Sequence, residues 1–221
     1  MAVVTDRPGA PEDDLAGVAE AQARFSAAIE GLSDADARRP SRLDGWTVGH
    51  VLTHVARNAD SHVRRAEAAA RAETVDQYPG GFEGRAAEID AGAGRPARQI
   101  VEDVRTSAGR LDAAWRQVPP AAWDVVSRDV GGTERPLRSL PARRWQELEV
   151  HLVDLDLAVT YREWPDAFVG RFLPVMRPTA GPRLAEGDGL PRRGALDERE
   201  ELAWLYGRLV RPDLPELAPW G

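Results

Sequence analysis

The sequence consists of segments with a helical period of apolar residues, separated by stretches rich in glycine, proline and charged residues. In residues 15–29 the apolar residues recur at steps of three and four behind Asp13 and Asp14, which predicts an amphipathic helix with an acidic start. Residues 33–38 predict a short helical turn. A second long period predicts a helix that begins at Asp44 or Gly45 and continues to about Ala72.

The middle of the chain has a weaker pattern. Residues 77–95 are rich in glycine, and we expect a long loop there with a helical turn at residues 85–90. A third long helix is predicted after Pro96 and is expected to end at Pro119 and Pro120. Residues 123–136 alternate weakly around two glycines, which predicts a small β-hairpin.

The stretch from residue 141 to residue 161 is apolar around most of its circumference when it is drawn as a helix, which is typical of a buried helix. Glu147 and His151 lie four positions apart in it and therefore on one face. A buried carboxylate is costly unless a partner satisfies it. A metal ion or an ordinary hydrogen bond between the two side chains would do so, and this stretch alone supports both interpretations.

Four long helices with short or looped connections predict a mainly α protein built on a four-helix bundle, whose interior is a common place for metal sites. After Trp164 the pattern changes to a predicted helix at residues 166–176, a linker rich in proline and glycine at 177–194, and a final helix at 196–209. We therefore expect a helical bundle in residues 1–164 and a small C-terminal α or α/β domain in residues 165–221.

Composition narrows the chemistry. The chain has no cysteine, so it offers no thiolate ligand, disulfide or nucleophilic thiol of its own. All its basic residues counted as Lys or Arg are arginines, which excludes a lysine Schiff base. A net charge of -7 with arginines spread along the chain argues against nucleic-acid binding. No apolar run approaches the roughly 20 residues of a membrane span, and the polar start does not resemble a signal peptide, so we expect a cytoplasmic protein without a membrane partner.

Histidines supply the candidate chemistry. His50 and His54 lie with Asn58 on a polar ridge of the second predicted helix, and either histidine is placed to join Glu147 and His151 as a third metal ligand. Two imidazoles and one carboxylate are a ligand set of catalytic zinc sites and also suit non-haem iron. The alternative for the ridge is a solvated helix face without a metal.

Three separated blocks of sequence then carry a resemblance. The runs GWTVGHVLTHVARNADSHVRRAEAA, YPGGFEGRAAEIDAGAGRPA and RRWQELEVHLVDLDLAV, the last followed by WPDAF, resemble the mycothiol-dependent maleylpyruvate isomerase family over about residues 15–168. The resemblance implies a DinB-like four-helix bundle that holds a divalent metal, usually zinc, on His54, Glu147 and His151. His50 would then be a supporting or helix-packing residue.

The resemblance also suggests further site residues. Asn58, the only asparagine, lies one turn after His54 and is a candidate for orienting cofactor or substrate, with a polar residue at a helix interface as the alternative. The WLYGR segment resembles the closing helix of the family's second domain, which makes Arg208 the candidate catalytic arginine. Arg57, Arg144 and Arg208 are candidates for binding cofactor or substrate carboxylates through their guanidinium groups.

The implied function is a metal- and mycothiol-dependent isomerase of the maleylpyruvate type. In such an enzyme a metal-held thiolate adds to the cis double bond, the resulting single bond rotates, and elimination gives the trans product. Two alternatives stay open: a mycothiol S-transferase that conjugates another electrophile, and a non-catalytic bundle that binds a ligand. The expected partners are a small carboxylate substrate and a low-molecular-weight thiol.

Overall fold

The computed structural model describes residues 9–192 and 194–219, and within these ranges the chain is mainly α-helical. The contacts within the chain divide it into two compact units, Met1–Leu155 and Asp156–Gly221. This division falls earlier than the boundary after Trp164 that the sequence pattern suggested. None of the helices in the described ranges is long and apolar enough to cross a membrane.

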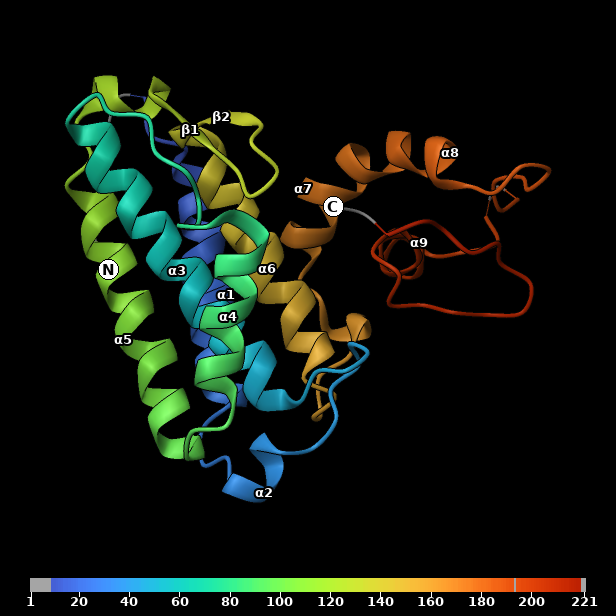
Figure 1. Cartoon of the computed structure of the whole chain (residues 1–221). Helices are drawn as coiled ribbons and strands as arrows, with labels where there is room; N and C mark the ends of the chain where they lie inside the picture. The colour runs from blue at the N-terminus through green and yellow to red at the C-terminus, as the bar shows by residue number, and fades with distance from the viewer. Residues whose placement is uncertain (1–8, 193, 220–221) are drawn as a thin grey trace. The chain divides into compact units, whose positions relative to one another are not determined.

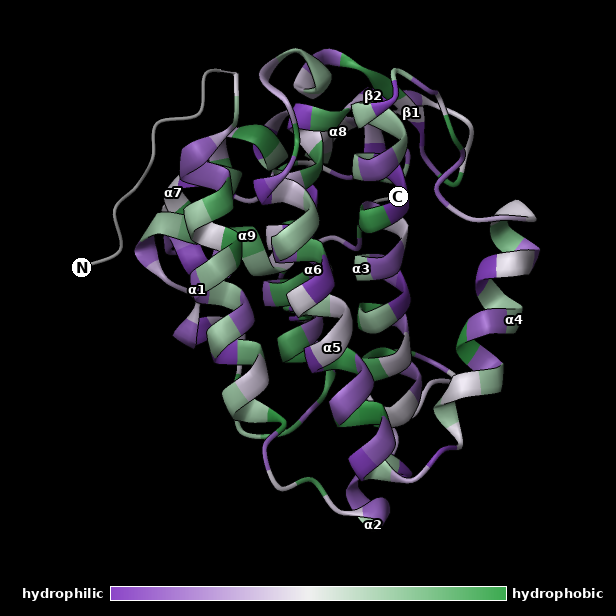
Figure 2. Cartoon of the chain, turned by 90° about the vertical axis from the view of Figure 1, so that its left-hand side faces the viewer, coloured by the Kyte–Doolittle hydropathy of each residue, from purple (hydrophilic) through white to green (hydrophobic). Residues whose placement is uncertain are grey.

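The first unit is a four-helix bundle, as predicted. It consists of α1 (Glu12–Ala28), α3 (Val48–Ala70), α5 (Ala97–Arg116) and α6 (Leu140–Asp154), which lie side by side (Figure 1). Hydrophilic and hydrophobic positions alternate along these helices, as amphipathic helices require (Figure 2). Fully buried apolar side chains from all four helices form the core, among them Phe25, Leu52, Val55, Ile100, Val104, Leu148 and Val153.

Helix α3 begins at Val48, later than the predicted start at Asp44 or Gly45. The reason is a capping box, in which the Thr47 hydroxyl accepts a hydrogen bond from the backbone N–H of His50 and the Thr47 N–H donates to Nδ1 of His50 at 3.2 Å. Gly45 lies before this cap with a φ of +75°, which the helix excludes. His50 is therefore committed to the start of its own helix.

The glycine-rich segment before α5 contains a helix, α4 (Gly81–Ala93), and the prediction of a long loop is wrong. Gly80 caps it with a φ of 77°. Of its residues only Ile89, Gly92 and Ala93 are buried, so its apolar period is too short to stand out in the sequence. It packs on α3 through a close contact at Gly49, where an added Cβ would lie 2.4 Å from the carbonyl oxygen of Ala93.

Helix α6 ends at Asp154, and the predicted continuation to residue 161 is wrong. Asp156 has a φ of 50°, a left-handed conformation that ends the helix and that aspartate adopts more readily than most residues. The apolar residues Leu157, Val159 and Tyr161 therefore lie outside α6. The apolar period extended past the helix because it belongs to two different elements.

Shorter elements complete the first unit. The turn α2 (Asp34–Ala37) was predicted, and Ser33 caps it. After α5 the 3-10 turn η1 (Pro120–Asp124) leads into the predicted hairpin, in which β1 (Val126–Arg128) pairs antiparallel with β2 (Glu134–Pro136). A second 3-10 turn, η2 (Leu137–Ser139), leads directly into α6.

The second unit is helical in its described part, where no β-strand occurs. It contains α7 (Asp166–Met176), with the predicted bounds, α8 (Ala180–Arg183) within the predicted linker, and α9 (Glu198–Leu205), which is shorter than predicted. The 3-10 turns η3 (Tyr161–Glu163) and η4 (Arg177–Thr179) precede α7 and α8. Packed aromatic rings form its core, namely Trp164, Phe168, Phe172 and Tyr206.

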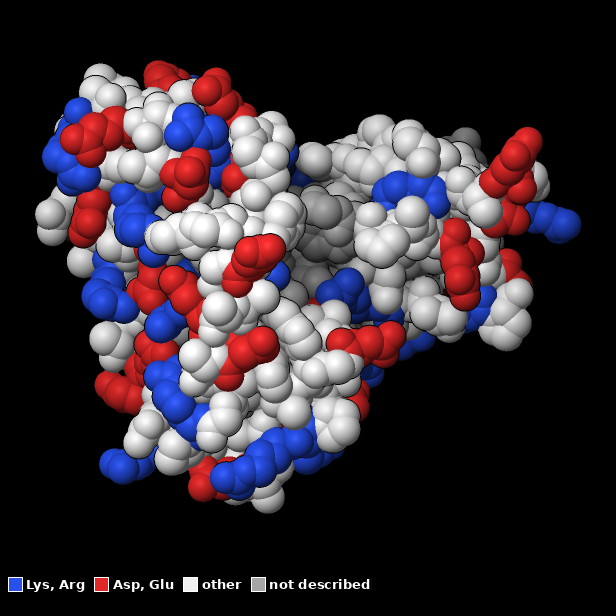
Figure 3. Space-filling model, in the orientation of Figure 1, with Lys and Arg blue, Asp and Glu red and all other residues white. Residues whose placement is uncertain are grey.

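Arginine and acidic side chains are interspersed on the face of the bundle shown in Figure 3. Several of these charges join helices. Asp103 on α5 binds Arg57 of α3 and Arg95, both at 2.7 Å, and Asp60 binds Arg57 at 2.9 Å. Arg57 is thus held by two carboxylates at the contact between α3 and α5.

The approach of α4 to α3 can be tested at Gly49. We expect Gly49→Ala to lower the free energy of unfolding by about 1–3 kcal/mol, because the new methyl group would overlap a backbone oxygen that has little room to move. Gly109→Ala on α5, where an added Cβ meets nothing within 4 Å, is the matched control and should raise stability by about 0.5–1 kcal/mol. Urea unfolding of both variants measures the difference, and equal effects would contradict the close contact.

His62 on α3 is buried with its ring edge toward Trp115 of α5 at a centroid distance of 5.8 Å. Burial lowers the pKa of His62 well below its ordinary value of 6.5, and the positive charges of Arg65, Arg144 and Arg143 lower it further, against the opposing charge of Glu147. The folded protein therefore holds His62 neutral at a pH where the unfolded chain protonates it.

This neutral histidine predicts acid sensitivity. A depressed pKa contributes stability above the unfolded value of 6.5 that is lost as pH falls below it, by about 1.4 kcal/mol per pH unit. Between about pH 7.5 and about pH 5, wild type should lose about 2 kcal/mol more than His62→Leu. Urea unfolding of both proteins at the two pH values gives this difference, and parallel losses would show that His62 is not the group responsible.

Candidate metal centre

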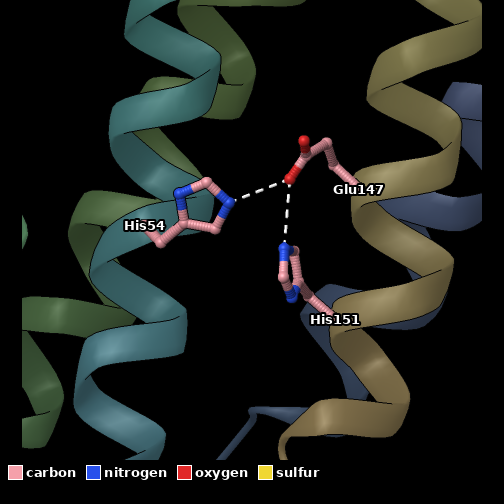
Figure 4. Close-up of side chains that lie close together, drawn as sticks. All are labelled: His54, Glu147 and His151. Carbon is pink, nitrogen blue, oxygen red and sulfur yellow. Dashed lines mark hydrogen bonds and ion pairs between the residues drawn. The ribbon is translucent and has the colours of Figure 1, made fainter. Parts of the chain in front are cut away.

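Three side chains that are far apart in the sequence converge between α3 and α6 (Figure 4). His54 comes from the middle of α3, and Glu147 and His151 come from successive turns of α6. The spacing of four residues places the last two on one face of their helix, as the sequence indicated. The structure therefore brings together the three residues for which the sequence predicted a shared role, and it does so with His54 and not with His50.

The three side chains meet at one carboxylate oxygen. Oε2 of Glu147 lies 2.9 Å from Nε2 of His54 and 3.1 Å from Nε2 of His151. The ligand atoms of all three residues lie within 4.8 Å of one another, and the two imidazole rings are nearly perpendicular at a centroid distance of 4.7 Å. Without an ion, the carboxylate accepts a hydrogen bond from both imidazoles, which is also the simpler of the two interpretations that the sequence left open.

Burial and hydrogen bonding set the charges of this group. Burial lowers the pKa of His54 to about 4, against the hydrogen bond and the charge of Glu147. Burial alone would raise the pKa of Glu147, but its hydrogen bonds with His151 and His54 outweigh that effect and hold the pKa well below its usual value. Near neutral pH the group therefore contains a neutral His54 beside an ionised Glu147.

Asp154 fixes the orientation of His151. Its Oδ2 accepts a hydrogen bond from Nδ1 of His151 at 2.9 Å, and its side chain is fully buried. Burial lowers the pKa of His151, but the hydrogen bonds with Asp154 and Glu147 outweigh it and raise the pKa to about 9. The contact holds the proton on Nδ1 and turns Nε2 toward Glu147, which is the arrangement found around metal-ligating histidines.

Two residues beside His54 were missed in the sequence. Nη2 of Arg85 on α4 lies 3.3 Å from Nδ1 of His54, and the Arg85 guanidinium lies over the ring of Trp46 at 5.8 Å. The Trp46 ring in turn lies 5.7 Å from that of His54. Arg85 was missed because its segment was expected to be mostly loop, where the direction of a side chain cannot be inferred.

Asn58 and Arg144 form a buried pair one turn away. Nη1 of Arg144 donates to Oδ1 of Asn58 at 2.9 Å and to the Val55 carbonyl at 2.8 Å, while Nη2 donates to Oε1 of Gln22 at 3.2 Å. Both side chains are almost fully buried. The structure thus places Arg144 among protein partners on α3 and α1, and it is not available to clamp a substrate. The Oδ1 atom of Asn58 is engaged at a helix interface.

The other predicted residues do not join the group of three. Arg57 is held by Asp60 and Asp103, as described above. Arg208 belongs to the second unit, where its Nη1 donates to the Tyr206 carbonyl at 2.6 Å. Cofactor contacts of Arg57 and Asn58 and a catalytic role of Arg208 stay predictions.

The donor set fits a divalent transition metal. Two imidazole nitrogens and one carboxylate oxygen are the ligands of zinc sites that keep a position open, and the same set suits non-haem iron. The Glu147 side chain keeps 26% of its surface exposed, so the group is not sealed from solvent. Ligation through both Nε2 atoms would replace the hydrogens that they now direct at Glu147.

Comparisons with known proteins point in one direction. Residues 18–156 match the family model described as "Mycothiol maleylpyruvate isomerase N-terminal domain". The crystal structure of the mycothiol-dependent maleylpyruvate isomerase has the same fold, with a TM-score of 0.81 and 22% identity over 95% of this chain and 97% of that chain. The crystal structure of a histidine-to-alanine mutant of a mycothiol-dependent maleylpyruvate isomerase matches with the same TM-score and 21% identity over the same shares. No curated protein matches the sequence.

Proposed function

The chain belongs to the mycothiol maleylpyruvate isomerase family, and from this premise we propose that it is a metal- and mycothiol-dependent enzyme that isomerises the cis double bond of a small carboxylate of the maleylpyruvate type. One observation carries the proposal: His54, Glu147 and His151 converge from two helices as a set of three donors. A bundle with a purely structural role has no need for two imidazoles directed at one carboxylate oxygen.

We assign His54, Glu147 and His151 as ligands of a divalent metal, with zinc as the first candidate. When bound, the metal and mycothiol together would supply a thiolate at neutral pH, which adds reversibly to the double bond so that the bond can rotate before elimination. The chain has no cysteine, so the sulfur must come from outside the protein. The absence of a protein thiol thus agrees with a thiol cofactor.

The residues of the chain have distinct tasks in this proposal. Glu147 contributes a negative charge that offsets part of the charge of the metal, and its low pKa keeps it ionised for this purpose. Asp154 orients His151. We propose that Asn58 acts indirectly, by holding Arg144 and with it the position of α6 against α3.

The proposed ligands and the reaction can be tested together. We expect purified wild type to hold one equivalent of metal and to convert maleylpyruvate to fumarylpyruvate only when mycothiol is added. His54→Ala should lose metal and activity, whereas His50→Gln should keep both, because glutamine can replace His50 in the capping box. Metal analysis, circular dichroism and an absorbance assay provide the three readouts.

Each alternative function gives a different result in the same experiment. A stable mycothiol adduct with another electrophile, without isomerisation, would indicate an S-transferase that uses the same site. Wild type that remains folded and metal-free after reconstitution with zinc would contradict the metal assignment and support a non-catalytic bundle.

The contact between Asp154 and His151 makes a separate prediction. Asp154→Asn keeps the size of the side chain but removes the negative charge that holds the proton of His151 on Nδ1. We expect zinc affinity to fall about 10- to 100-fold. Competition with a chromophoric chelator measures the affinity, and Asp156→Asn, just beyond α6, is the control. Unchanged affinity in a folded Asp154→Asn protein would show that the contact does not support ligation.

A further inference from the structure

Two arginines near the three proposed ligands lack the acidic partners that most arginines of the bundle have. They are Arg85 on α4 and Arg143 on α6. In the described part of the chain no carboxylate lies within ion-pair distance of either guanidinium, in contrast to Arg57 and Arg95, which share Asp103 at 2.7 Å. Both unpaired arginines are half-buried, where an uncompensated charge is costly.

Arg85 contacts the proposed centre directly. Its guanidinium touches Nδ1 of His54 and the face of Trp46, and neither partner carries a negative charge. The contact with His54 requires that Nδ1 has no hydrogen, so the proton of this neutral imidazole lies on Nε2, facing Glu147. Ligation through Nε2 would move that proton to Nδ1, which could then no longer accept from Arg85. The guanidinium would be free for another acceptor.

Arg143 lies one helical turn before Glu147 on the same face of α6. Burial and the nearby charge of Arg135 lower its pKa, while Asp129 and Glu147 act in the opposite direction. Asp129 is already bound by Arg135 at 3.0 Å and by backbone N–H groups of its own turn. Arg143 therefore has negative charges nearby but no acidic group bound to its guanidinium.

A third guanidinium adds to the positive charge of this region. Arg65 on α3 is 2% exposed, and its Nε donates only to the Ser61 carbonyl, at 3.4 Å. Tyr78, also buried, responds to the charges of Arg65, Arg85 and Glu147 together, which places these groups around one phenol. Three arginines thus surround a single ionised glutamate, and a divalent metal would add more positive charge.

We propose that Arg85 and Arg143 are positioning residues that bind the two carboxylates of a small dicarboxylate, one on each side of the centre formed by His54, Glu147 and His151. Planar guanidinium groups bind carboxylates bidentately, so two of them define an orientation as well as an affinity. This inference rests on the proposed function and deepens it, because it names the residues that would select a doubly charged substrate over a singly charged one.

Direct binding tests the inference without relying on turnover. Calorimetric titration of zinc-loaded protein with maleate, a dicarboxylate, and with crotonate, a monocarboxylate of similar length, compares the two charge types. We expect maleate to bind wild type more tightly, and Arg85→Gln and Arg143→Gln each to lose about 10- to 100-fold in maleate affinity with little change for crotonate. Arg98→Gln, at an exposed position of α5, is the control and should bind as wild type does.

Additional measurements keep the result interpretable. Zinc content and thermal unfolding of every variant must match wild type, and Arg143→Lys, which keeps the charge but not the planar fork, should recover only part of the affinity. Equal affinity for maleate and crotonate, phosphate binding as tight as maleate, or unchanged binding in both folded Gln variants would each overturn the proposal.

The same data separate this inference from the proposed function. Loss of maleate binding in the Gln variants, in a protein that does not isomerise maleylpyruvate, would support the dicarboxylate site and contradict the isomerase. Isomerisation that is unaffected by both substitutions would support the isomerase and contradict the roles of Arg85 and Arg143.

Discussion

The contact between α3 and α6 depends on where the Glu147 carboxylate finds its partners. A carboxylate between helices is costly unless it is satisfied, and here Oε2 alone contacts Nε2 of both His54 and His151. His151 is on the same helix as Glu147, so only His54 makes a link across the interface. A slip of one turn, about 5.4 Å, would remove the imidazole of α3 from this oxygen. The polar group therefore restricts the two helices to the register in which three donors converge.

A second buried charge supports the same register from outside the group. Arg144 is fully buried on α6 and donates to Val55 and Asn58 of α3 and to Gln22 of α1. Burial lowers its pKa to about 10, which leaves it protonated at neutral pH. Removing one partner would leave a buried charge poorly satisfied, which is strongly destabilising. The geometry of the candidate centre is thus held by residues that need never touch a ligand.

The sequence predicted this centre better than it predicted its surroundings. The bundle, the hairpin, α7 and the pairing of Glu147 with His151 followed from apolar periods and from the i, i+4 spacing, both of which are local. The convergence with His54 is a tertiary contact, and periodicity alone could not choose it over His50; the resemblance made that choice. Helix α4 was missed because its buried side is made of Ile89 and small residues, and Arg85 was missed with it.

These gaps matter because the two levels of the site have different chemical tasks. The donors from α3 and α6 would activate a thiol that the cysteine-free chain does not possess, and an isomerase and an S-transferase would need that step equally. What distinguishes the two reactions is how the electrophile is held while its bond rotates. A substrate fixed at both ends keeps its carboxylates in place only if the rotation moves them little, so the guanidinium of Arg85, free to turn away from His54, would have to follow one end. Substrate choice in this fold therefore depends more on the mobility of α4 side chains than on the metal ligands.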